Sequence, residues 1–74
     1  MQSHPIDLLT RREREVLAMF SCGMTSKTIA AELVLSPLTV QAHAKSIYRK
    51  LKVTNRVQAV LLYRESAPLM DQNE

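Results

Sequence analysis

The segment from Ser36 to Leu51 constrains the fold of this chain more than any other stretch. Its apolar residues recur at intervals of three or four, so that at about 100° per residue they form one narrow stripe on an α-helix. Ser36 and Pro37 precede the stripe as an N-cap and a first helical residue, where the missing proline N–H costs nothing. The sequence therefore predicts a helix over Pro37–Leu51, and its inward stripe consists of Val40, Ala44, Ile47 and Leu51.

Capping signals predict three further helices. Thr10 followed by Glu13 is a capping box, and Gly23 can close that first helix in a left-handed conformation. Two more helices are expected over about residues 25–33 and 55–65. The chain has one Gly, three Pro and no alternating β-branched run, so we predict an all-α four-helix bundle.

Length and composition limit the organisation of the chain. Its 74 residues allow one domain, which we place at residues 9–65, between an arm at 1–8 and a flexible tail at 66–74. Cys22 stands alone and is expected to be a small core thiol, which leaves no disulfide. We expect no metal and no cofactor, because His4 and His43 lie far apart in the sequence without further ligands. No apolar run has the length of a membrane span, and we expect a cytoplasmic protein.

The charges of the chain are unevenly distributed. The whole chain carries +3, whereas residues 36–56 contain five cations and no acid. A positive field concentrated in this way indicates a polyanionic partner. The five cations are Lys45, Arg49, Lys50, Lys52 and Arg56.

The two middle helices predict a helix-turn-helix over about residues 26–45. A short helix, a tight link and a longer basic helix are the layout in which the second helix enters the major groove of DNA. The face of that helix opposite the apolar stripe carries Leu38 and the four residues that we expect to read bases. These four are Gln41, Ala42, Lys45 and Arg49. Phosphate contacts are expected from residues at the helix starts and at the rim, namely Lys27, Thr28, Ser36, Thr39, Lys50, Lys52 and Arg56.

Five spaced motifs carry a resemblance to a known family. In order they are LTRREREVL, IAAEL, S-x-x-TV-x-x-H, I-x-x-KL-x-V and NR-x-x-AV. The stretch Leu9–Val60 that contains them closely resembles the LuxR/NarL/FixJ (GerE-type) DNA-binding domain of bacterial transcription regulators. The resemblance implies a four-helix domain that binds DNA through its third helix and commonly dimerises through its fourth. It also places base reading at Gln41, Ala42 and Lys45, and the family often has a basic residue at the first of these and a larger apolar one at the second.

The last predicted helix is apolar nearly all round. Val57, Val60 and Leu61 form one stripe, and Ala59, Leu62 and Tyr63 form another. A small domain has no second core for both stripes, so one of them is available to a partner. We expect a two-fold homodimer whose interface consists of Ala59, Leu62 and Tyr63.

The acidic residues do not indicate an active site. Glu13 and Glu15 are two residues apart and face different sides of a helix, and arginines flank them. We expect ion pairs there, with Glu15 bracing a basic residue of the third or fourth helix. The GMTSKT stretch lacks the glycine of a phosphate-binding loop, and no nucleophile has a paired base. The sequence therefore does not predict an enzyme.

Together these patterns predict a sequence-specific DNA-binding transcription regulator. Its expected partners are double-stranded DNA and a second copy of the chain, with RNA polymerase as a further candidate. The alternative is a helix-turn-helix module that binds another regulator or RNA polymerase and has only weak affinity for DNA. Whether the chain is the effector domain of a longer response regulator or a stand-alone regulator stays open at this point.

Overall fold

The computed structural model describes residues 5–71 and confirms the predicted all-α fold with four α-helices. Residues 1–4 of the expected arm and 72–74 of the expected tail lie outside the described residues. The described part of the chain contains no strand. Its elements are the 3₁₀ helix η1 (Pro5–Leu8), α1 (Arg11–Ser21), α2 (Ser26–Leu33), α3 (Pro37–Leu51) and α4 (Arg56–Asp71).

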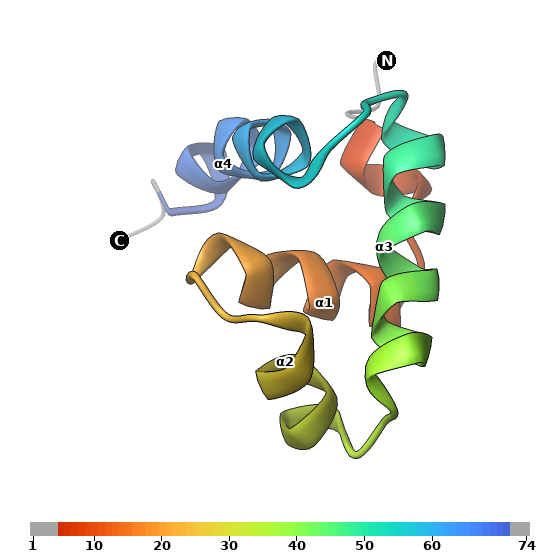
Figure 1. Cartoon of the computed structure of the whole chain (residues 1–74). Coiled ribbons are helices and arrows are strands. Elements are labelled where there is room, and N and C mark those ends of the chain that lie inside the picture. The colour runs from red at the N-terminus through yellow and green to blue at the C-terminus, as the bar shows by residue number, and fades with distance from the viewer. Residues whose placement is uncertain (1–4, 72–74) are drawn as a thin grey trace.

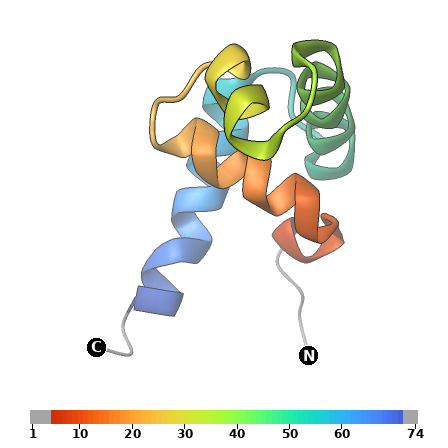
Figure 2. The same ribbon diagram turned by 90° about the horizontal axis from the view of Figure 1, so that it is seen from below.

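The four helices surround one core. α1 lies in the middle, α2 and α4 pack on either side of it, and α3 runs across all three (Figure 1). Seen from below, α2 lies on the opposite side of the molecule from η1 and the C-terminal part of α4 (Figure 2). The buried side chains are Leu9, Val16, Leu17, Phe20, Ile29, Ala30, Val40, Ala44, Ile47, Leu51 and Ala59, and they include the whole predicted stripe of α3.

The caps of α1 form as predicted. The backbone N–H of Glu13 donates to Thr10 Oγ1, and the backbone N–H of Thr10 donates to Glu13 Oε1, which completes the capping box. Gly23 has φ +86°, and the N–H of Met24 reaches back to the carbonyl of Met19. Together with the bond from the Gly23 N–H to the carbonyl of Phe20, this bond satisfies carbonyls at the helix end that would otherwise lack donors. Cys22, which we expected in the core, is exposed at this helix end.

The turn between α2 and α3 uses an unexpected residue. Val34 adopts the left-handed conformation with φ 57°, and the N–H of Leu35 closes the end of α2 on the carbonyl of Ala30. A β-branched residue is unfavourable there because its Cβ crowds the following carbonyl. Lys52 adopts the same conformation at the end of α3. Only Gly23 was recognisable from the sequence as a left-handed residue.

The helix α4 is longer than the sequence predicts. It begins at Arg56, and the N–H of Gln58 donates to Asn55 Oδ1 as an N-cap requires. Its backbone continues to Asp71 instead of ending near Glu65, and Ser66 is buried. The helix thus runs through Pro68, although a proline inside a helix removes one backbone hydrogen bond and crowds the carbonyl four residues before it.

Candidate nucleic-acid interface

The outer face of α3 brings the predicted base-reading residues together. Gln41, Ala42, Lys45 and Arg49 are all exposed on the side of α3 opposite its buried stripe. Neither Lys45 nor Arg49 forms an ion pair with any described residue. Both charges therefore point to solvent and are available to an anionic ligand.

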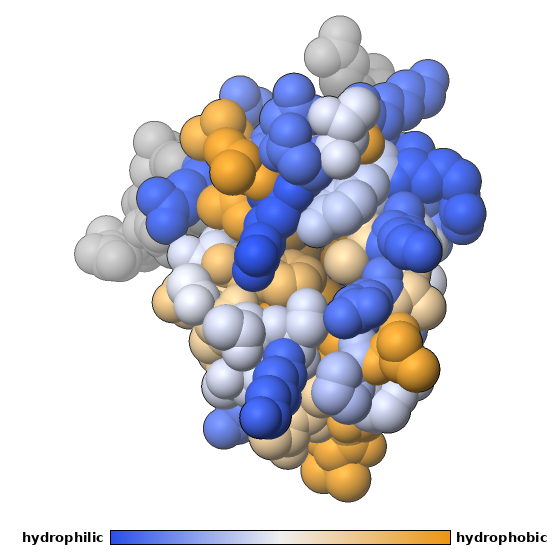
Figure 3. All heavy atoms as spheres, in the orientation of Figure 1, coloured by the Kyte–Doolittle hydropathy of each residue, from blue (hydrophilic) through white to orange (hydrophobic). Residues whose placement is uncertain are grey.

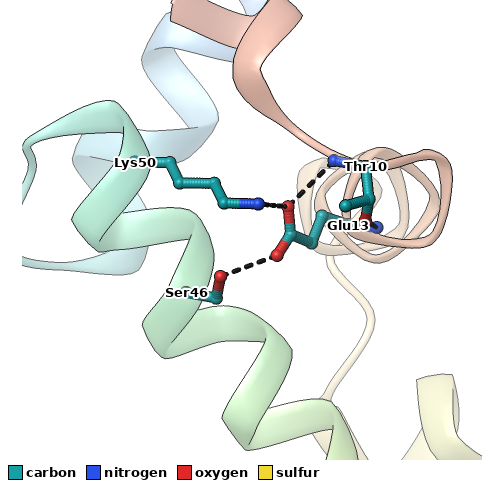
Figure 4. A network of polar contacts seen from close by, with 4 residues as sticks. All are labelled: Thr10, Glu13, Ser46 and Lys50. Atoms are coloured by element: carbon teal, nitrogen blue, oxygen red, sulfur yellow. Dashed lines mark hydrogen bonds and ion pairs between the residues drawn. The ribbon is translucent and has the colours of Figure 1, made fainter.

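The inner edge of α3 carries a different arrangement, in which a buried carboxylate is fully hydrogen-bonded. Glu13 of α1 is only 5% exposed, and Lys50 Nζ donates to its Oε1 at 2.8 Å (Figure 4). Ser46 Oγ donates to its Oε2 at 2.7 Å, while the Thr10 backbone supplies a third donor at 2.9 Å. Both carboxylate oxygens thus have partners, as a buried charge requires.

These contacts control the ionisation of Glu13. Burial by itself raises the pKa of a carboxyl group, but the hydrogen bonds from Lys50, Ser46 and Thr10 outweigh it and lower the pKa of Glu13 from 4.5 to about 2. The group is therefore ionised at neutral pH despite its burial. It joins α1 to the last turns of α3 through an ion pair and a hydroxyl contact.

This network overturns the prediction for Glu15 and also engages Lys50. Glu15 does not brace α3 or α4, because it pairs with Arg11 and Arg12 of its own helix, and Glu13 has the bracing role instead. Lys50, expected at a phosphate, has its charge matched inside the fold by Glu13. The other four cations of residues 36–56 have no acidic partner among the described residues.

The N-termini of α2 and α3 carry matching pairs of hydroxyl groups. Thr25 caps α2 with its Oγ1 3.0 Å from Thr28 Oγ1, and Ser36 caps α3 with its Oγ 2.9 Å from Thr39 Oγ1. One hydroxyl hydrogen is used within each pair, so the other remains available to an anion. Because the positive ends of two helix dipoles lie at the same places, both N-termini favour phosphate groups. Lys27 is exposed in the first turn of α2.

A shallow groove connects α3 with the starts of α2 and α4. Its lining includes Gln41, Lys45 and Tyr48 from α3, Ser26 from α2 and Arg56 from α4. The guanidinium carbon of Arg56 lies 4.9 Å from the centre of the Phe20 ring, an arrangement that orients the charge by cation–π attraction. Lys52 is exposed at the end of α3.

The exposed apolar stripe of α4 is not the one predicted to form the dimer interface. Ala59 is 0% exposed and belongs to the core, and Leu62 and Tyr63 are half-buried against it. Val57 and Leu61 face outward instead, 68% and 57% exposed. Apolar surface accordingly appears over α4 in Figure 3. The predicted interface is therefore wrong at Ala59, because α4 packs with the side of the helix that carries this residue against the core.

Two other classes of site receive no support from the described part of the chain. No three His, Cys, Asp or Glu side chains gather there into a group that could hold a metal ion. None of the described helices has both the length and the hydropathy needed to cross a membrane.

The sequence matches a family model and several curated proteins. Residues 7–63 match the family model described as "Bacterial regulatory proteins, luxR family". A nitrate/nitrite response regulator protein homolog of Haemophilus influenzae is 42% identical over 64 residues, which are 86% of this chain and 31% of that protein. The transcriptional regulatory protein UhpA of Escherichia coli is 50% identical over 52 residues, 70% of this chain and 26% of that protein.

A third relative is matched over similar shares of both chains. The probable transcriptional regulatory protein NarL of Mycobacterium tuberculosis is 47% identical over 53 residues, which are 72% of this chain and 24% of that protein. The chain thus spans less than a third of the length of these relatives.

Proposed function

Since the chain belongs to the luxR family of bacterial regulatory proteins, we propose that it recognises a specific DNA sequence by inserting α3 into the major groove. Its class is DNA-binding transcription regulation and not enzyme catalysis. Its site of action is the bacterial cytoplasm, where the chromosome lies. We further propose that it acts as the effector part of a longer response regulator, because its relatives are about three times its length.

The outer face of α3 is the observation that carries this proposal. The helix has 15 residues and is therefore about 22 Å long, and its exposed side combines Lys45 and Arg49 with no acid. A major groove about 12 Å wide admits one such helix. Carboxylates on this face would approach phosphates, which explains their absence between Ser36 and Arg56.

The proposed contacts divide into two kinds. Gln41, Ala42, Lys45 and Arg49 lie on the outer face of α3 and read base edges. The phosphate contacts come from the capped helix starts and the basic rim, while Lys50 leaves this set because Glu13 holds it. The remaining phosphate-contacting residues are Lys27, Thr28, Ser36, Thr39, Lys52 and Arg56.

A binding titration with two lysine variants tests this division. Lys45→Ala is expected to lower affinity for a selected operator by about tenfold or more and affinity for random duplex far less, because base contacts carry about 1–3 kcal/mol of discrimination. Lys52→Ala should weaken both duplexes alike and reduce the slope of log K against log salt by about 0.9. Equal losses on both duplexes from Lys45→Ala would overturn its base-reading role.

We also propose that two copies associate through the stripe of Val57 and Leu61. Both side chains are exposed, and Phe20 and Val60 line the shallow groove beside them. A second copy would remove this apolar surface from water and present two recognition helices to half-sites about one helical turn apart.

Selection from random DNA tests the dimer. Paired half-sites are expected, and Leu61→Glu should remove the preference for a paired site over a single half-site while circular dichroism stays unchanged. Monomeric binding by the wild-type protein to single half-sites would contradict the dimer. If random duplex at low salt failed to bind at all, the alternative of a module that binds another regulator or RNA polymerase would replace DNA recognition.

A further inference from the structure

The outer face of α3 contains one residue that the contacts proposed above do not use. Leu38 is 76% exposed in the first turn of the helix. It belongs neither to the buried core nor to the partly buried side chains packed against that core within the described residues. The fold therefore gains almost nothing from a leucine at this position. The nearby residues Ser36 and Thr39 are polar, so the leucine is also unlike its surroundings.

Helix geometry places Leu38 in line with the base-reading residues. Ala42, Lys45 and Arg49 follow it at spacings of four, seven and eleven residues, which share one face of a helix at about 3.6 residues per turn. Separate apolar patches appear near the α2–α3 turn and the first turns of α3, and hydrophilic surface follows along the rest of that helix (Figure 3). The outer face thus has an apolar beginning and a basic continuation.

We propose that Leu38 is a specificity-determining residue that contacts the 5-methyl group of a thymine in each half-site. This inference rests on the proposed insertion of α3 into the major groove. In that groove the thymine methyl is the apolar group among the base-edge features that are read, whereas a leucine side chain has neither donor nor acceptor for the others. Residues at the N-terminal end of a recognition helix contact base edges.

The surroundings of Leu38 fix its approach. The Ser36 and Thr39 hydroxyls, 2.9 Å apart, border the same helix start and favour a phosphate there, which holds the first turn of α3 against the groove. Pro37 before Leu38 lacks an N–H, so that residue brings no unpaired backbone donor to the groove. Contact with the methyl would remove apolar surface of both partners from water.

The experiment replaces thymine by deoxyuridine, which removes only the methyl group. After an operator has been selected, each thymine of a half-site is replaced in turn, and binding of the wild-type protein and of Leu38→Ala is titrated. We expect one replacement to weaken wild-type binding about fourfold per half-site, the effect of about one buried methyl group, and to leave Leu38→Ala unaffected. Leu38→Ala itself should bind the unmodified operator at least as weakly as the wild type binds the replaced one.

Leu8→Ala is the matched control, since it makes the same change at a leucine that is 62% exposed in η1, outside α3. This variant should respond to every replacement as the wild type does, and Leu38→Ala should keep the wild-type melting temperature. A methyl read by Ala42 would weaken both proteins equally and would not count as support. The inference is overturned if no replacement affects the wild type, or if each affects the wild type and Leu38→Ala by the same factor.

The outcome also separates this inference from the function on which it rests. If the wild type prefers its operator and Lys45→Ala removes that preference, DNA recognition stands whatever Leu38 does. If the wild type binds operator and random duplex equally, DNA recognition through α3 and the role of Leu38 fail together.

Discussion

Lys45 and Lys50 are the same residue type on the same helix, yet the fold treats their charges in opposite ways. Lys50 donates to a buried carboxylate of α1 and is 30% exposed, whereas Lys45 is exposed and forms no ion pair with a described residue. They are five positions apart on the helix, about 140° around its axis, which turns one toward α1 and the other away from it. One lysine therefore stabilises the domain, and the other is left for a ligand.

This comparison shows why a count of positive charges overstates a binding surface. Residues 36–56 carry five cations in the sequence, and the fold neutralises one of them through an acid that lies 37 residues away from Lys50. Glu13 is also the N3 residue of the capping box of α1. A single carboxylate thus caps one helix and joins it to another.

The largest expected effect is the acid sensitivity of the Glu13 network. The pKa of Glu13 is lowered from 4.5 to about 2 by folding, so its contribution to stability is complete above pH 4.5 and is lost as the pH falls toward 2. The shift corresponds to about 3 kcal/mol at neutral pH. Urea denaturation should show Glu13→Gln about that much less stable than the wild type at pH 7, with the gap closing between about pH 4.5 and 2.

Glu15→Gln is the matched control for this experiment. Glu15 is half-exposed, and among the described residues its ion pairs are with arginines of its own helix, so its removal should cost less than about 1 kcal/mol. A constant gap between Glu13→Gln and the wild type across this pH range would show that ionisation of Glu13 does not stabilise the fold.

The next largest effect on stability is expected when each of the two lysines is replaced by methionine in a separate variant. Lys50→Met leaves the buried carboxylate without its cation and should lower the free energy of unfolding by about 2 kcal/mol. Lys45→Met removes an exposed charge and should change it by less than about 0.5 kcal/mol. Denaturation and DNA titration of both variants measure the contrast, because only Lys45→Met should reduce operator preference. Equal stability of the two variants would remove the distinction between the lysines.

The sequence predicted most of the fold because caps and periodicity are local. The Thr10 capping box, the Ser36–Pro37 start of α3 and its buried stripe all depend on residues within a few positions of one another. The partner of Lys50 and the outward stripe of α4 depend instead on how helices rotate against one another. Helical spacing alone offered two apolar stripes on α4 and could not say which one α1 would cover.

The smallest expected effect on stability concerns the two turns that flank α2. These turns offer the same contrast between a residue that serves the fold and one that does not. Gly23 and Val34 both end helices with positive φ, at 86° and 57°. Glycine tolerates this conformation, whereas a β-branched residue is strained in it, and Val34 is 89% exposed and so gains little packing in return.

We therefore expect opposite outcomes at the two turns. Val34→Asn should raise the free energy of unfolding by about 0.5–1 kcal/mol, because asparagine tolerates the left-handed region better than valine. Gly23→Ala should lower it by about 1 kcal/mol, and the cost would come from the backbone alone, since an added Cβ meets nothing within 4 Å. Thermal denaturation measures both changes. If Val34→Asn were destabilising, Val34 would have a favourable interaction that outweighs its strain, and the α2–α3 turn would belong with the residues that hold the fold together.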